Sequence, residues 1–367
     1  MAAHSHHLWP DASFSGQVDC WEDAARLADR KWDRIMGEVW PEAQSHVAAE
    51  LGAGEPNSIV FASNTHDLLI RLAAACPRNG GPLRILTSDG EFHSARRQFA
   101  RWEEAGDVSV TRIASEPFGT FLARFADAVA ASAHNLIFVS QLMFGSGLIV
   151  EDIAAVAALG RSDGLWVAID GYHSFMALPA PLAESSAGTA FFLGGGYKYA
   201  MAGEGCAFMH CPPGFGPRPP ITGWYAEFDE LGLKPGEAGY ARDAKRFMGA
   251  TFDASGLYRF NAVQRTLASE GLTTPLISSH VAALQQRLID LLDGSALGRA
   301  KLLNPLTGEP HARFLAWRTP EAARWCDSLM REGCVTDVRG DVLRVGLGLY
   351  HDSSDIEAFA TLARSLS

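Results

Sequence analysis

The chain has 367 residues, of which 47% are hydrophobic and 20% are charged, and its formal net charge is −11 at pH 7. This length suggests about two domains, and the acidic balance gives no electrostatic support to a nucleic-acid partner. No apolar run approaches the roughly 20 residues that a membrane-spanning helix needs. We therefore expect a globular protein with neither a nucleic-acid partner nor a membrane span.

The first residues of the chain, 1–16, lack the basic start and the apolar stretch of a signal peptide. They contain His4, His6 and His7, with no cysteine or carboxylate at metal-ligand spacing. We expect a solvated arm here and no metal site. The six cysteines form no C-x-x-C pair, so we expect reduced thiols and a cytoplasmic protein.

Hydrophobic periodicity predicts one helix over residues 21–51, and strands and helices alternate after it. The expected strands are mostly continuous apolar runs, over residues 58–62, 84–87, 108–113, 135–140, 166–170, 190–195 and 205–210. The expected helices cover residues 66–76, 94–105, 121–133 and 150–159. This alternation is typical of a mainly parallel sheet that is covered on both faces.

The last third of the chain predicts a second unit. A loop rich in proline and glycine, 212–224, precedes two expected helices, 260–270 and 274–292. The second helix is long enough to link two domains. Beyond Leu297, strands such as 334–338 alternate with helices, which indicates a separate and smaller α/β unit.

Polar residues gather where the expected strands end. In a parallel sheet, ligands bind at the carboxyl ends of the strands. The residues at these ends are Ser63, Asn64 and Thr65, then Ser88 to His93, then Ser140 and Gln141, then Asp170 to His173, and finally Tyr197 and Lys198.

Asp170 and Lys198 each follow an apolar strand, where a charge is costly unless it has a partner. They could pair with each other as a structural salt bridge. Alternatively, both could serve a cofactor, the lysine as a Schiff base and the carboxylate as the partner of a pyridinium nitrogen. The second interpretation also gives a helix beginning at Asn64 a phosphate to bind, and gives Phe92 or His93 a ring to stack on.

Three short stretches carry a family resemblance: Asp170-Gly-Tyr-His173, Gly195-Gly-Tyr-Lys198-Tyr and Gly203-Glu-Gly. They resemble the signature region of class V, fold-type-I pyridoxal-phosphate enzymes, which include aminotransferases, kynureninases and cysteine desulfurases. The resemblance extends over about residues 55–350 and is greatest to kynureninase. It implies an α/β fold with a large, mainly parallel domain at 45–260 and a small α/β domain made of 1–44 and 261–367.

The resemblance also implies a set of site residues. Lys198 and Asp170 would be catalytic, with pyridoxal 5'-phosphate as the cofactor. The implied cofactor contacts are Asn64, Thr65, Phe92, Gln141, Asp170, His173, Tyr197, Lys198, Trp224 and Thr251. Among them Tyr197 would bind the phosphate and Phe92 would stack on the ring.

The substrate implied by the resemblance is an amino acid. Arg344 would bind its α-carboxylate, and His93 would be a further substrate contact. Trp224 and Thr251 would reach the site from a neighbouring subunit, so we expect a homodimer with shared sites. Arg344 could instead form a structural ion pair with Asp337 or Asp341, and Trp224 could belong to the core.

Several positions depart from the kynureninase pattern. Glu91-Phe92-His93 stands where those enzymes have Asn-Phe-Pro, and Thr251 replaces the asparagine that contacts the kynurenine ring. Gly195 stands where many class V members have a serine. These departures leave kynurenine itself in doubt as the substrate.

The expected function is that of a pyridoxal-phosphate enzyme acting on an amino acid, either a kynureninase-like hydrolase or a class V aminotransferase. The alternatives are a class V enzyme of the cysteine desulfurase or lyase type, and a non-catalytic protein with the same fold. Cys334 lies only ten positions before Arg344 at an apparent strand start, which disfavours the desulfurase. No G-x-G-x-x-G follows the first strand, which disfavours a dinucleotide-binding protein.

Overall fold

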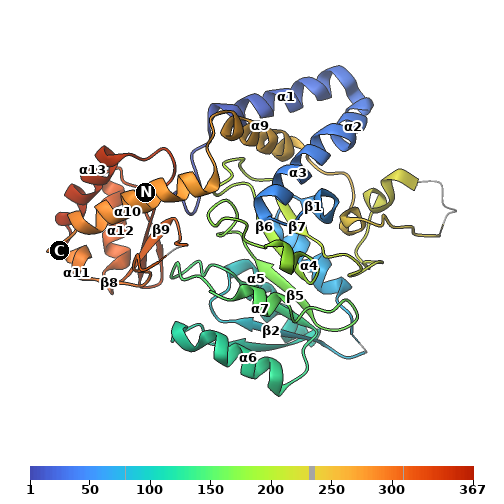
Figure 1. Cartoon of the computed structure of the whole chain (residues 1–367), viewed down its shortest axis with the longest axis horizontal. Coiled ribbons are helices and arrows are strands. Elements are labelled where there is room, and N and C mark those ends of the chain that lie inside the picture. Colours follow the sequence, from blue (N-terminus) through green and yellow to red (C-terminus); the bar gives the residue numbers. More distant parts are fainter. Residues whose placement is uncertain (79, 231–235, 309) are drawn as a thin grey trace.

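The computed structural model describes residues 1–78, 80–230, 236–308 and 310–367 (Figure 1). Two β-sheets form its framework, one of seven strands and one of four. None of the helices within these ranges is long and apolar enough to cross a membrane.

The seven-stranded sheet has the order β1-β7-β6-β5-β4-β2-β3. Only β7 runs antiparallel to its neighbours β1 and β6, so the predicted mainly parallel sheet is confirmed. Its strands are β1 (Ile59–Ala62), β2 (Leu83–Ser88), β3 (Val108–Ile113), β4 (Leu136–Ser140), β5 (Trp166–Asp170), β6 (Ala190–Gly195) and β7 (Ala207–His210). The central strands β4 and β6 are buried along their whole length, which explains their continuous apolar sequences.

Helices connect the strands of this sheet. They are α4 (Thr65–Ala75), α5 (His93–Ala105), α6 (Phe121–Ala131), α7 (Ile153–Ala157) and α8 (Glu184–Ala187). The side chain of Asn64 caps α4 by accepting a hydrogen bond from the Asp67 N–H at 2.9 Å. Because α4 follows β1 and α5 follows β2, the first turns of both helices lie at the carboxyl edge of the sheet. They line the same cavity as Tyr172 and Tyr197, which follow β5 and β6.

The smaller unit contains an antiparallel sheet with the order β10-β11-β9-β8. Its strands are β8 (Lys301–Leu302), β9 (Phe314–Arg318), β10 (Asp337–Arg339) and β11 (Val342–Gly346), and its helices are α11 (Ala296–Arg299), α12 (Ala322–Arg331) and α13 (Ser353–Arg364). The long helix α10 (Thr274–Leu291) runs from the large unit into this one (Figure 1). The strand expected from residue 334 begins only at Asp337.

The N-terminal helical region differs from the prediction of one helix over 21–51. It consists of α1 (Asp11–Leu27), α2 (Lys31–Arg34) and α3 (Trp40–Leu51), joined by short 3₁₀ and π segments. The chain changes direction at Ala28, whose φ is 50°. This turn lets α1 pack along α9 (Ser255–Ser269), while Trp40 of α3 is buried in the core (Figure 1). Good helix formers continue across the turn, so the sequence pattern carried no signal for it.

The expectation of a solvated N-terminal arm was wrong for His4 and His7. Both are buried, whereas His6 is exposed. Ala2 pairs with Gly346 in a parallel β-bridge at the end of β11. In Figure 1 the N-terminus accordingly lies among the elements of the small unit, whereas α1 lies against α9.

Candidate active site

Lys198 lies just beyond β6 and is only 5% exposed. Its Nζ lies 3.0 Å from Nε2 of His173. Among the residues that the structure describes, no carboxylate forms an ion pair with it. Burial lowers the pKa of Lys198 to about 7, although the charge of Asp170 works in the opposite direction. A large fraction of this amine is therefore neutral at physiological pH, as a nucleophile or a base requires.

Asp170 ends β5, the strand next to β6, and its Cα pairs with that of Leu193. Its Oδ1 accepts a hydrogen bond from the Tyr172 N–H at 3.0 Å. Burial raises the pKa of Asp170, while this hydrogen bond and the charge of Lys198 lower it. Asp170 and Lys198 are thus electrostatic neighbours, but the direct salt bridge that the sequence left open is not formed.

Aromatic rings surround the Lys198 amine. Nζ lies 4.4 Å from the centre of the Tyr172 ring, 5.3 Å from that of Tyr197 and 5.5 Å from that of Phe92. The sequence analysis identified Phe92 and Tyr197 but missed Tyr172. A Cβ at Gly195 would lie 2.3 Å from the Tyr172 hydroxyl, so this glycine leaves space for the ring. The only signal for this contact in the sequence was the combination of a large ring at position 172 with a glycine at position 195.

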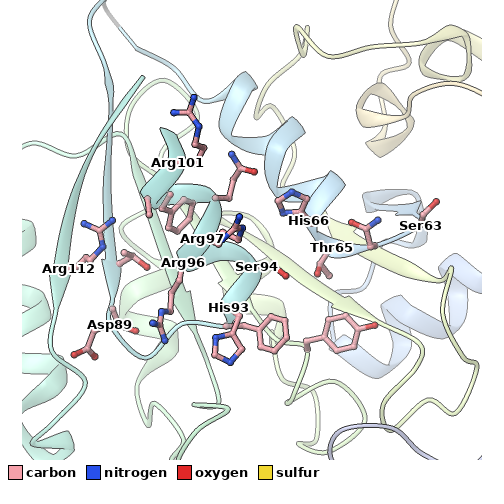
Figure 2. A pocket seen from close by; sticks show the side chains of 18 of the residues that line it. Ser63, Thr65, His66, Asp89, His93, Ser94, Arg96, Arg97, Arg101 and Arg112 are labelled. Atoms are coloured by element: carbon pink, nitrogen blue, oxygen red, sulfur yellow. The ribbon is translucent and has the colours of Figure 1, made fainter. Parts of the chain in front are cut away.

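A cavity of about 1460 Å³ opens beside these rings (Figure 2). Tyr172 and Tyr197 line it, together with Asn64 and Thr65 at the start of α4 and Phe92 and His93 at the start of α5. The first backbone N–H groups of a helix have no partner within the helix. The α4 end of the cavity is therefore suited to an anion.

Four arginines also line the cavity, and the sequence analysis missed all of them: Arg96, Arg97, Arg101 and Arg112. Figure 2 shows the first three along α5, with Arg112 on β3. Arg112 pairs with Glu103 at 2.9 Å, and Arg101 lies 3.9 Å from Glu104. The arginines of α5 are exposed, so in the sequence they look like any solvated helix face.

Glu91 is a further buried group that the sequence analysis did not assign. Its two carboxyl oxygens accept hydrogen bonds from the hydroxyls of Ser88 and Ser140, both at 2.5 Å. Burial raises the pKa of Glu91 to about 7, against the effect of the two serines. The contact joins the tips of β2 and β4 and fixes the backbone immediately before Phe92.

Arg344 on β11 is 2% exposed and is paired with Asp337, one of the two partners considered from the sequence. Its Nη2 and Nε lie 2.6 Å and 2.7 Å from Oδ1 of that carboxylate. Its Nη1 donates to the carbonyl of Phe144. These bonds use three of the five guanidinium donors and leave one on each terminal nitrogen without a partner in the described part of the chain. Asp341 instead lies 3.7 Å from Arg318.

Asp337 is ionised. Burial alone would raise its pKa, but nearby His4 and the charge of Arg344 lower the pKa to about 2. The second carboxylate oxygen lies 2.9 Å from Nη2 of Arg339. A single partly buried carboxylate therefore holds two guanidinium groups.

Of the remaining predicted cofactor contacts, one lies beside Lys198 and three lie elsewhere. His173 touches Lys198, and its buried Nδ1 has no hydrogen-bond partner among the described residues. Gln141 donates to the carbonyl of Pro181 at 2.8 Å and lines a different cavity. Trp224 and Thr251 contact each other at 3.3 Å, and neither lines the cavity beside Lys198. Their contribution from a neighbouring subunit stays a prediction.

Comparisons with known proteins agree with the fold. The sequence matches the family model "Aminotransferase class-V" over residues 32–310 and the model "Kynureninase C-terminal domain" over residues 277–362. Isopenicillin N epimerase of Streptomyces clavuligerus is 28% identical over 199 residues, which are 52% of this chain and 48% of that protein. The match thus spans about half the length of this curated relative.

Solved structures match along the whole chain. A cysteine desulfurase from Thermococcus onnurineus NA1 superposes with a TM-score of 0.80 at 17% identity and covers 99% of this chain and 94% of its own. The cystine C-S lyase C-DES, in complex with cysteine persulfide, gives 0.82 at 15% identity and covers 100% and 97%. The α/β fold expected from the sequence is thereby confirmed.

Proposed function

The chain belongs to the class-V aminotransferase family, and we propose that it is a pyridoxal-phosphate-dependent enzyme acting at the α-carbon of an amino acid. Lys198 carries the proposal. Its amine is buried among aromatic rings, its pKa is about 7, and it touches His173. A lysine with a purely structural role at this strand tip would be expected to pair with Asp170, the carboxylate at the end of the adjacent strand.

The residues at the site fit the family's cofactor, pyridoxal phosphate. The buried Nδ1 of His173 has no partner among the described residues, and the rings of Phe92 and Tyr172 lie near the amine. These rings would hold the pyridine, Asp170 would bind its nitrogen, and the start of α4 would bind the phosphate. When bound, the cofactor supplies an electrophilic carbon for the amine and accepts electrons from the substrate's α-carbon.

The chain's own groups then have separate tasks. Lys198, with its lowered pKa, can remove a proton from the α-carbon at neutral pH. Burial and the neighbouring Lys198 lower the pKa of His173 well below its usual value, so the imidazole is neutral and can share that proton at Nζ. Arg344 has two donors left for the substrate's α-carboxylate, one on each terminal nitrogen.

For the overall reaction we propose a kynureninase-like hydrolysis or a transamination. The match to the kynureninase C-terminal domain, which includes Arg344, supports this choice. The second candidate is an epimerisation, because the curated relative is an epimerase. A cysteine desulfurase or lyase is the remaining alternative, supported by the structural relatives. Against the desulfurase, no cysteine occurs among the described residues that line the cavity.

One screen separates these reactions. The purified protein loaded with pyridoxal phosphate is mixed with L-kynurenine, cystine, and the L- and D-forms of alanine, cysteine and glutamate. We expect an absorbance change with at least one of them, followed by a product that identifies the reaction: anthranilate, a keto acid, sulfide or the opposite enantiomer. No change with any amino acid would contradict the proposal and favour a non-catalytic protein.

We also propose that the enzyme is a homodimer. Trp224 is 42% exposed and contacts Thr251, and neither residue lines the cavity beside Tyr172 and Tyr197, as expected of residues that complete a partner's site. Mixing the Lys198→Ala and Trp224→Ala variants should then form hybrid dimers with one intact site and recover part of the activity. If activity is recovered although the mixed protein is strictly monomeric, the shared-site proposal is wrong. It is also wrong if a proven dimer recovers no activity.

A further inference from the structure

The N-terminal arm, defined here as residues 1–7, is built into the strand that carries Arg344. The Gly346 N–H donates to the carbonyl of Met1 at 2.9 Å, and the Ala3 N–H donates to the carbonyl of Gly346 at 3.3 Å. A Cβ at position 346 would lie 2.1 Å from Nδ1 of His4. The glycine at the end of β11 thus makes the space in which His4 lies.

His4 is fully buried beside the Asp337–Arg344 pair. Its ring stacks on Phe314 with centroids 4.8 Å apart, and the Arg344 guanidinium lies 5.6 Å from the same phenylalanine ring. Nε2 of His4 lies 3.9 Å from Oδ1 of Asp337, which is too far for a hydrogen bond. Neither ring nitrogen has a hydrogen-bond partner among the described residues. A buried polar group without a partner is costly, so its retention requires a reason.

The Asp337 oxygen that lies 3.9 Å from Nε2 of His4 is the one that Arg344 uses. Oδ1 of Asp337 accepts from both Nε and Nη2 of Arg344. If a substrate carboxylate bound to the two remaining donors draws the guanidinium towards itself, the two bonds to Oδ1 lengthen and Oδ1 can accept another donor. The N–H of His4 can then take their place, since it needs to approach by only about 1 Å to reach hydrogen-bonding distance.

We propose that His4 is a positioning residue for Arg344: it donates a hydrogen bond to Asp337 when Arg344 engages the α-carboxylate of the substrate. The inference rests on the proposed function, because it takes an amino acid as the ligand. It makes His4 a part of the substrate site, although His4 does not need to touch the substrate.

The charge state of His4 agrees with this role. Burial lowers the pKa of His4 to about 4, and the charge of Arg344 works in the same direction, whereas Asp337 opposes them. The ring is therefore neutral at pH 7, with one N–H donor and one acceptor nitrogen. A neutral donor can stabilise Asp337 without adding a positive charge near Lys198.

The test compares two substitutions that differ in the donor. His4→Phe keeps the stack on Phe314 and removes the N–H, whereas His4→Gln places an amide donor near the position of Nε2. The measurement is the absorbance titration of the loaded protein with the amino acid that gives the largest change in the screen above. We expect His4→Phe to bind it about tenfold more weakly and His4→Gln within about twofold of the wild type, with the absorbance before addition unchanged in both.

His7→Phe is the matched control, because His7 is also a buried histidine of the arm but packs edge-on against Tyr199 and Tyr350. It should leave the affinity unchanged. If His4→Phe does not fold, His4→Asn replaces it, since its shorter amide does not reach Asp337. An unchanged affinity in the variant without the donor, or a tenfold loss in His4→Gln as well, would overturn the proposal.

A double-mutant cycle with Asp337→Ala, which removes the acceptor, distinguishes the proposed route from a direct contact with the substrate. If His4 acts through Asp337, His4→Phe should have no further effect in the Asp337→Ala background. A tenfold loss in both backgrounds would mean that His4 binds the substrate itself, which overturns the positioning role. If the wild type responds to no amino acid, the proposed function fails; if it responds and His4→Phe responds equally, only this inference fails.

Discussion

Lys198 and Arg344 are both buried basic side chains near the same site, but their surroundings differ. Lys198 has no ion-pair partner within the described residues, and burial lowers its pKa to about 7. Arg344 is paired at 2.6 Å with Asp337, whose pKa is lowered to about 2. The first environment produces a reactive neutral amine, and the second produces a permanently charged planar fork. In the function proposed above, the large unit would therefore carry out the chemistry and the small one would recognise the carboxylate.

Removing the reactive amine should have the largest effect. Lys198→Ala should reduce turnover by about 10²–10⁴-fold or more, because the base and the attachment point are lost together. Borohydride reduction followed by peptide mass mapping should place the cofactor on Lys198 in the wild type and on no residue in the variant. Lys301→Ala, which changes an exposed lysine, is the control. A label on another lysine of the wild type would contradict the assignment.

Asp170→Asn should cause the next largest fall in turnover. The amide has nearly the same volume but cannot hold a proton on the pyridine nitrogen, so we expect turnover to fall by roughly 10²-fold or more. The fold should survive, because the variant can still accept the hydrogen bond from the Tyr172 N–H. Turnover and the melting temperature are measured together. Turnover close to that of the wild type would show that the carboxylate is structural.

Arg344→Lys tests the role of the Arg344–Asp337 pair in binding the substrate's carboxylate. Losing the planar fork should cost about 2–3 kcal/mol, or roughly fifty-fold in affinity for every amino acid that binds. The absorbance of the loaded protein before addition of the amino acid should not change, because the lysine keeps the charge beside Asp337. Loss of the cofactor with unchanged amino-acid affinity would mean that the arginine serves the cofactor or the fold.

Much of the large unit could be predicted from the sequence. Its strands are continuous apolar runs, and Asn64, Asp170 and Lys198 stand where those runs end. The N-terminal arm could not be predicted in this way, because the burial of His4 depends on Gly346, which lies at the other end of the chain. Tyr172 was missed for a similar reason: the space for its ring is made by a glycine on the neighbouring strand.

The pairing of Arg344 was only half predictable. The sequence offered Asp337 and Asp341 as partners, and the antiparallel register of β10 and β11 places Asp337 directly opposite the arginine. The α5 arginines gave no signal, because the cavity they line forms only when α4 and α5 lie beside the same sheet edge. Sequence patterns show which residues face a core, but they do not show which surfaces meet across a cavity.

The unpaired lysine should also affect stability through pH. In the cofactor-free protein its pKa is lowered from 10.5 to about 7, so between these values the unfolded chain binds more protons than the folded one. The lysine's contribution to folding stability should therefore rise with pH across this window and be constant below it. Denaturant unfolding of the wild type and of Lys198→Met at pH 7 and pH 9.5 measures the difference. Equal pH slopes would indicate an amine that is solvated or paired.

The smallest effects should come from Tyr172. Tyr172→Phe keeps the ring beside the lysine amine and should change cofactor affinity by about twofold or less. Tyr172→Ala removes the ring and should weaken cofactor binding by roughly three- to tenfold, the usual value of one aromatic contact. Equilibrium titration of the cofactor-free variants with pyridoxal phosphate measures both. A large loss in Tyr172→Phe would show that the hydroxyl, which fills the place of a side chain at Gly195, binds the cofactor itself.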